Sequence, residues 1–174
     1  VGCMAFVALI LNPIIVWTQI KSNPYPLVFK CLKDSFITAF FTRSSAANIP
    51  VNMTLCEELG LDEDNYSISI PLGATINMDG TSIMQGVAVV FIAQAYGIPL
   101  TMGNLATVVV TATLASIGTA GVPSVGLVTL TMVFNSVGLP VEAIGLIMGI
   151  DRILDMTRTA VNITGDAVCT TIVA

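Results

Sequence analysis

Long apolar stretches separated by short polar breaks dominate this chain. Residues 1 to 20 carry no charge, and a membrane crossing needs roughly 20 residues. Asn12 and Pro13 fall inside this stretch, where they would kink a helix without ending it. A polar connection with Lys21 follows. The pattern predicts a transmembrane helix over 1–20.

The next apolar stretch, 27–58, is interrupted by small and polar residues around Arg43. Its arms, 27–42 and 49–58, would measure roughly 24 and 15 Å as helices. The hydrocarbon core is about 30 Å thick, so neither arm can cross it. We therefore predict a re-entrant hairpin with Pro50 in its tip. The acidic run 57–64 then marks a return to water.

Three further segments complete the chain. Residues 66–97 form one apolar pass that is broken by the polar residues 77–81. Residues 104–137 form a second pair of arms of about 21 Å each, too short to cross, on either side of a small-residue tip with Pro123. Residues 141–174 form a final helix rich in polar groups.

This order of segments predicts an all-α membrane protein with an inverted-repeat transporter core, two re-entrant helical hairpins and a broken transmembrane helix. Lys21, Lys30 and Lys33 fall on one side, while the opposite loops lack Lys and Arg. The positive-inside rule then places these lysines in the cytoplasm. The first hairpin is expected to open inward and the second outward.

Composition agrees with a bilayer and excludes several function classes. Only 10% of the 174 residues are charged, against about 25% in soluble domains. The net charge of −5 disfavours a nucleic-acid partner, and the absence of His removes His-based metal sites and catalytic triads.

We expect a multi-pass protein of the cell (inner or plasma) membrane that is not an enzyme. Since the chain starts without Met inside an apolar run, we also expect it to be a fragment.

A polar stripe on the final helix is the main candidate site. Because their spacing follows the helical repeat, its members share one face within an arc of about 100°. They are Asp151, Asp155, Arg158, Thr159, Asn162 and Asp166. Ionisable residues at membrane depth mark functional sites. The alternative is an Asp155–Arg158 pair that only joins helices.

The chemistry of these groups suits a zwitterion with an additional acidic group. Arg158 can present a planar fork to a carboxylate, and Asp155 can accept from an ammonium. Asp79 and Asp166 lie beside predicted backbone breaks, where freed carbonyls can coordinate Na⁺; for Asp79 a helix cap is the alternative.

The two hairpin tips add further candidates. Ser44 and Ser45 precede a helix start, which favours an anionic carboxylate. The second tip, 121–123, is suited to act as a lid. Either tip could also be a plain turn.

Four blocks of the sequence, 42–45, 77–81, 116–123 and 155–166, resemble the signature blocks of the sodium:dicarboxylate symporters, which include archaeal aspartate transporters and excitatory amino-acid transporters. The blocks occur in the family's order, and the resemblance covers essentially the whole chain. It implies that Arg158, helped by Thr81, holds the side-chain carboxylate of an amino acid and that Asp155 binds its amino group. Asn162 and the backbone at Ser45 would bind the α-carboxylate. The implied substrate-binding set is Arg43, Ser44, Ser45, Met78, Thr81, Val122, Gly126, Asp155, Arg158, Thr159 and Asn162.

The resemblance also implies three sodium sites. The first would use carbonyls of Gly73, Asn77 and Asn162 together with Asp166. The second would use carbonyls of Thr75, Ser116, Ile117 and Thr119. The third would use Asp79 and the Asn77 side chain, with partners on an earlier helix that this chain lacks. Coupling to H⁺ instead of Na⁺ stays open. The family's N-terminal scaffold helices, which form a homotrimer in the full-length protein, are likewise expected to be missing here.

One departure from the family's pattern leaves the substrate open, and two rival functions come from other classes. The segment 40–50 is closer to the bacterial serine/threonine:sodium branch, which lacks the arginine of the final helix; the presence of Arg158 and Asp79 favours an acidic substrate, aspartate or glutamate. A channel with re-entrant loops and an intramembrane aspartyl protease using Asp155 and Asp166 are rivals from other classes. Charged groups of both signs on one compact face favour the transporter.

Overall fold

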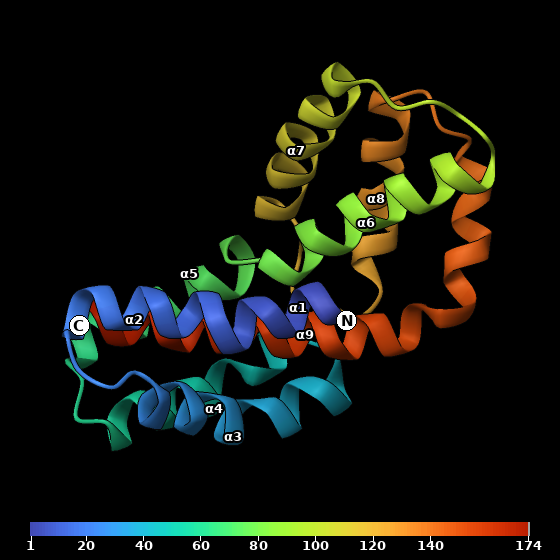
Figure 1. Cartoon of the computed structure of the whole chain (residues 1–174). Helices are drawn as coiled ribbons and strands as arrows, with labels where there is room; N and C mark the ends of the chain where they lie inside the picture. The colour runs from blue at the N-terminus through green and yellow to red at the C-terminus, as the bar shows by residue number, and fades with distance from the viewer. Residues whose placement is uncertain (174) are drawn as a thin grey trace.

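The computed structural model describes residues 1–173, and all regular elements of this range are helical. Figure 1 shows their arrangement. In chain order they are α1 (Gly2–Phe6), the π-helical turn η1 (Val7–Leu11), α2 (Asn12–Ile20), α3 (Tyr25–Thr42), α4 (Ser45–Glu58), α5 (Glu63–Ile76), α6 (Asp79–Ala95), α7 (Met102–Ile117), α8 (Val125–Ser136), the 3₁₀ turn η2 (Val141–Ala143) and α9 (Ile144–Val173).

The first three elements form one continuous helix, Gly2–Ile20, that is long and apolar enough to cross a membrane. The chain passes through Pro13 without ending the helix, as predicted. The wider turn η1 directly precedes Asn12 and Pro13; such turns accommodate a backbone that lacks a regular helical hydrogen bond. The helix ends at Lys21, whose φ of 53° is left-handed.

Two pairs of helices, α3–α4 and α7–α8, occupy the ranges of the predicted hairpins. One boundary was wrong. The second arm of the first pair begins at Ser45 and not at 49, because Ser44 caps the helix by accepting a hydrogen bond from the Ala47 amide at 3.2 Å. Pro50 therefore lies inside α4 and not in the tip. That either pair re-enters the membrane stays a prediction.

The pass that begins at Glu63 is interrupted at Asn77 and Met78, between α5 and α6. Asn77 has φ −85° and ψ 80°, and Met78 has φ −115° and ψ 49°, so neither continues the helix. The interruption frees backbone groups at the end of α5 and at the start of α6. The Glu63–Ala95 segment is the second one long and apolar enough to span a membrane.

Helix α9 is the centre of the packing. It runs beside α2 and α3 and contacts α4, α5, α6 and α8 as well. One apolar core lies among α1, α6, α7, α8 and the start of α9 and includes Ile92, Leu130 and Phe134. A second core joins α2, α3 and α4 to the last turns of α9 through Val28 and Leu55. These two cores hold the polar face of α9 between the helix pairs.

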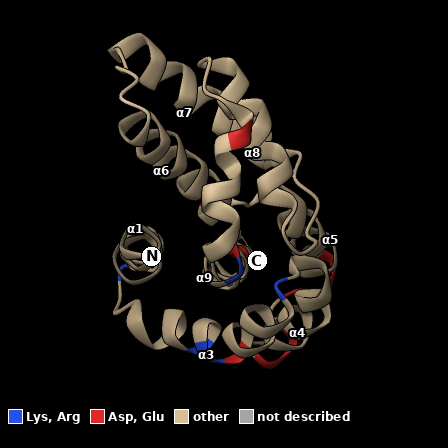
Figure 2. Ribbon diagram, turned by 90° about the vertical axis from the view of Figure 1, so that its right-hand side faces the viewer, with Lys and Arg blue, Asp and Glu red and all other residues tan. Residues whose placement is uncertain are grey.

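The outer surface of the described chain is strongly apolar. Phe6, Ile14 and Trp17 of the first helix are exposed, and so are Phe91 and Val109 of α6 and α7. Charged residues gather on α3 to α5 and inside the molecule on α9, whereas α6 and α7 are almost free of them (Figure 2). Such a surface suits lipid and not water, in agreement with the predicted all-α membrane protein.

Candidate functional site

The polar stripe of α9 faces protein, as predicted. All six of its side chains are at least 95% shielded from solvent: Asp151, Asp155, Arg158, Thr159, Asn162 and Asp166. Ile150 and Ile153 point outward on the opposite side. Because burying unpaired charges is costly, the neighbours of these six groups define what the site can bind.

Arg158 and Asp155 form a buried ion pair. Arg158 Nη2 lies 2.5 Å from Asp155 Oδ1, and Arg158 Nη1 lies 4.0 Å from Asp151 Oδ1. The Nη1 atom has no hydrogen-bond partner among the described residues, and neither has Asp151 Oδ1. The guanidinium covers Gly126 of α8, where a Cβ atom would come within 2.5 Å of Arg158 Cζ. Part of the arginine fork is therefore available to an acceptor.

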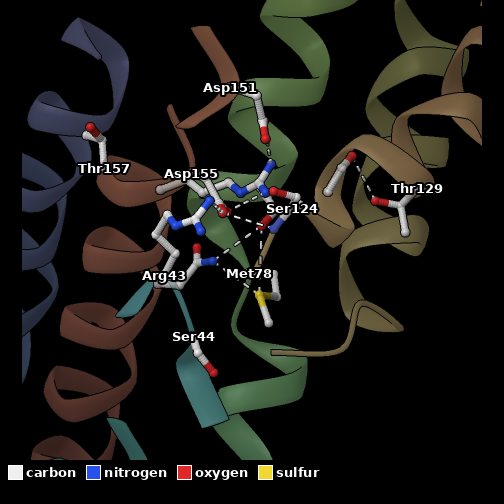
Figure 3. A network of polar contacts seen from close by, with 12 residues as sticks. Arg43, Ser44, Met78, Ser124, Thr129, Asp151, Asp155 and Thr157 are labelled. Carbon is white, nitrogen blue, oxygen red and sulfur yellow. Dashed lines mark hydrogen bonds and ion pairs between the residues drawn. The ribbon is translucent and has the colours of Figure 1, made fainter. Parts of the chain in front are cut away.

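Asp155 also holds both helix-pair tips. Its Oδ2 accepts a hydrogen bond from the Ser124 amide at 2.9 Å and lies 3.6 Å from Arg43 Nη1. Figure 3 shows these groups converging on one carboxylate. Both tip residues have left-handed backbones, with φ 62° at Ser124 and φ 55° at Arg43. Non-glycine residues keep such conformations only when their surroundings fix them.

The tips also contact each other. Ser44 Oγ donates to the Gly121 carbonyl at 2.7 Å, and the Ala46 amide donates to the same carbonyl at 3.2 Å. A Cβ atom on Gly121 would lie 3.0 Å from Ser45 Cβ, so a side chain there would push the tips apart by a few tenths of an ångström. Residues 77 positions apart thus close one side of the site.

We expect Ser44→Ala to weaken substrate binding about three- to tenfold, because one hydroxyl both caps α4 and joins the tips, and each such bond contributes about 1 kcal/mol. Substrate affinity measured by isothermal titration would test this. Ser22, an exposed serine before α3, provides the matched alanine control. Equal affinities for the two variants would contradict the assignment.

Asn162 connects α9 to the break between α5 and α6. Its Oδ1 accepts from the Gly80 amide at 2.7 Å, while its Nδ2 contacts Thr81 Oγ1 at 3.3 Å and Met78 Sδ at 3.1 Å. Gly80 allows this approach, since a Cβ there would lie 2.7 Å from the Arg158 carbonyl. The free N–H at the start of α6 thereby fixes the Asn162 side chain.

Asp166 lies one turn further along α9, against Gly73 of α5. The Asp166 carboxylate occupies the space that a Cβ atom on Gly73 would need. Its Oδ2 is buried and lacks a hydrogen-bond partner within the described range. Nearby, Asn77 Nδ2 donates to the Asn162 carbonyl at 3.2 Å. An unpaired carboxylate beside a helix break is a ligand set that suits a hard cation.

A small cavity lies at the centre of the polar groups. Its free volume is about 10 Å³, roughly the space of one water molecule. The predicted substrate residues that line it are Arg43, Ser45, Met78, Thr81, Val122, Asp155, Arg158, Thr159 and Asn162. A larger hollow of about 370 Å³ lies among α1, α6 and α9, but its lining is almost wholly apolar. It offers no converging polar groups with which to orient a charged ligand.

Some predicted residues lie outside this cavity. Ser44 and Gly126 act behind it, through Gly121 and Arg158. Thr119 lines the cavity, whereas the Thr75 and Ser116 hydroxyls donate within their own helices and Ile117 is exposed. Asp79 is exposed, with Oδ2 3.5 Å from the position of a Cβ on Gly165.

The sequence reasoning missed several backbone groups. The amides of Gly80 and Ser124 bind the central side chains, and Ala120 and Val125 line the cavity. Both amides lie at or just before the start of a helix. The anion-binding argument that singled out Ser45 at the start of α4 applies equally to α6 and α8.

The fold and this cluster define a helical protein with an apolar outer surface and a buried, charged cluster between two helix-pair tips and the α5–α6 break. The model of the Sodium:dicarboxylate symporter family matches residues 1–174, the whole chain, so the chain belongs to this family. The protein is thus a sodium-coupled membrane transporter of dicarboxylates or amino acids.

Proposed function

We propose that this protein carries out sodium-coupled symport of an acidic amino acid, aspartate or glutamate, by alternating access. The observation that carries the proposal is the meeting of Asp155, Arg158 and both tips around one small polar cavity, which the tips would have to open to admit an amino acid. An acidic amino acid has two carboxylates and one ammonium. The site offers an arginine fork, an amide-bearing Asn162 and a carboxylate to match them.

The roles follow from the chemistry of each group. Arg158 would bind the side-chain carboxylate with its guanidinium fork, using the Nη1 atom, which has no hydrogen-bond partner among the described residues. Asp155 would accept from the substrate ammonium. The α-carboxylate of the substrate would face Asn162 and the backbone amide of Ser45, where the start of α4 favours an anion.

Asp166 and the carbonyls of Gly73, Asn77 and Asn162 would bind one sodium ion, supported by the unpartnered Asp166 Oδ2. The carbonyls of Thr75, Ser116, Ile117 and Thr119 would bind a second, and Asp79 with Asn77 a third. Each charge carried inward across about 100 mV contributes roughly 2.3 kcal/mol to uptake. We further propose a homotrimer in the cell membrane, in which this domain moves as a rigid body.

The test is uptake by the complete protein in proteoliposomes. Labelled aspartate, glutamate and serine would be offered with an inward Na⁺ gradient, with an H⁺ gradient, or with neither. We expect aspartate or glutamate uptake that depends on Na⁺ and shows no effect of H⁺ alone. Sodium-dependent serine uptake without aspartate uptake would favour the serine/threonine branch, and current without any amino acid would favour a channel.

A further inference from the structure

Asn52 lies on α4, outside the central cavity, and its side-chain amide joins three helices. Its Nδ2 donates to the carbonyl of Ile163 on α9 at 3.2 Å. Its Oδ1 accepts from Ser35 Oγ on α3 and from Asn48 Nδ2 at 3.2 Å. Ser35, Asn48 and Asn52 are completely shielded from solvent. We call these three residues the α3–α4 amide cluster.

The carbonyl that Asn52 reaches is next to that of Asn162. The Asn162 carbonyl accepts from Asn77 Nδ2 at 3.2 Å, on the side of the α5–α6 break. Two consecutive carbonyls of α9 therefore each receive a side-chain amide, from two different elements. Asp166, with its unpartnered Oδ2, lies three residues beyond Ile163. The short segment 162–166 is thus held from two directions.

We propose that Asn52 is a positioning residue for sodium binding, and that it acts by fixing the 162–166 segment of α9. This inference rests on the proposed function, in which Asn162 and Asp166 supply sodium ligands. Peptide groups within one helical turn move together, so a shift of the Ile163 carbonyl also moves the Asn162 carbonyl and Asp166. Binding sites tolerate errors of about 0.5 Å in ligand position, which makes the outer hydrogen bonds part of the site.

The members of the cluster should differ in effect. Asn52 uses both ends of its amide, so its loss would release α9 and leave the Ser35 and Asn48 donors unpaired. Ser35 supplies one donor, to Asn52 Oδ1. Asn48 Oδ1 is buried without a partner among the described residues, so Asn48 contributes through its donor alone. We expect the loss of sodium affinity to be largest when Asn52 is replaced and smaller when Ser35 or Asn48 is replaced.

The experiment compares Asn52→Leu, Ser35→Ala and the control Asn135→Leu, at an exposed position near the end of α8, in the complete protein. Leucine keeps the branched shape of Asn52, with bulkier methyl groups, and removes its hydrogen bonds. Two readouts are used: the Na⁺ concentration for half-maximal aspartate uptake, and the rise in melting temperature on adding NaCl in place of choline chloride. The second reports sodium binding without transport.

For Asn52→Leu we expect the half-saturating Na⁺ concentration to rise about three- to tenfold, with a smaller thermal shift at fixed Na⁺. The KM for aspartate at saturating Na⁺ should change less, and Asn135→Leu should match the wild type. If Asn52→Leu fails to fold, Ser35→Ala should show the same change in smaller measure.

An unchanged Na⁺ dependence in both readouts, with only a lower maximal rate, would overturn the inference and leave Asn52 as a packing residue. Absence of sodium-dependent aspartate uptake in the wild type would instead overturn the proposed function. In that case the sodium-induced thermal shift still decides whether Asn52 positions a sodium site, so the two failures are distinguishable.

Discussion

Arg158→Ala is expected to abolish transport of acidic amino acids, lowering aspartate uptake by about a hundredfold or more. Removing one partner of a buried ion pair costs about 3–5 kcal/mol, because the remaining charge is left uncompensated. Here Asp155 would lose its 2.5 Å partner, and Asp151 would lose the cation 4.0 Å away. The variant would also lack the fork that binds the second carboxylate of the substrate.

Initial rates of labelled aspartate and serine uptake under a Na⁺ gradient would measure this effect. Arg152 lies on the same helix but is exposed, so Arg152→Ala is the matched control and should transport normally. Arg158→Lys should recover only part of the activity, because lysine supplies the charge without the bidentate geometry. Aspartate uptake that survives Arg158→Ala would remove the arginine from the proposed substrate site.

Gly73→Ala is expected to weaken sodium binding by about tenfold or more, as displacement of a metal ligand does. The new methyl group would occupy the position of the Asp166 carboxylate. Both groups are held by helix backbones, so the carboxylate must move. Overpacking of this kind also costs about 1–3 kcal/mol of stability.

The sodium concentration for half-maximal uptake and the sodium-induced shift in melting temperature would measure the loss. Gly86→Ala on α6 is the control, because a Cβ there meets nothing within 4 Å. It should be neutral or slightly stabilising, since alanine favours a helix over glycine by about 1 kcal/mol. A Gly73→Ala protein with wild-type sodium affinity would show that Asp166 is not a sodium ligand.

Sequence reasoning located the helices well because their boundaries depend on local groups. The run from Gly80 to Val141 contains no charged residue, which indicated a membrane environment. Glycine, proline and polar residues marked the breaks between the helical arms. The arm prediction of 49–58 began α4 too late because Pro50 indicated a tip, although Ser44 and Ser45 were expected to precede a helix start and Ser44 does cap it. Pro50 is the sixth residue of α4, beyond the first four amides that have no partner inside a helix, so α4 continues through it with one backbone hydrogen bond fewer.

The candidate residues of α9 were found from spacing alone, since one helix places every third or fourth side chain on one face. Their partners could not be found in this way. That Asp155 joins Ser124 to Arg43, or that Asn52 reaches Ile163 over 111 positions, depends on how separate helices pack. The backbone amide of Gly80 carries no side-chain signal at all.

Hydropathy and helical periodicity are local properties, so the amino-acid sequence was enough to identify a helical membrane protein with a charged face on its last helix. Tertiary structure alone decided which groups surround that face. Contacts between distant segments arise from apolar packing of α9 against its neighbours, and this packing sets the distances at which Arg158, Asp155 and the two tips meet.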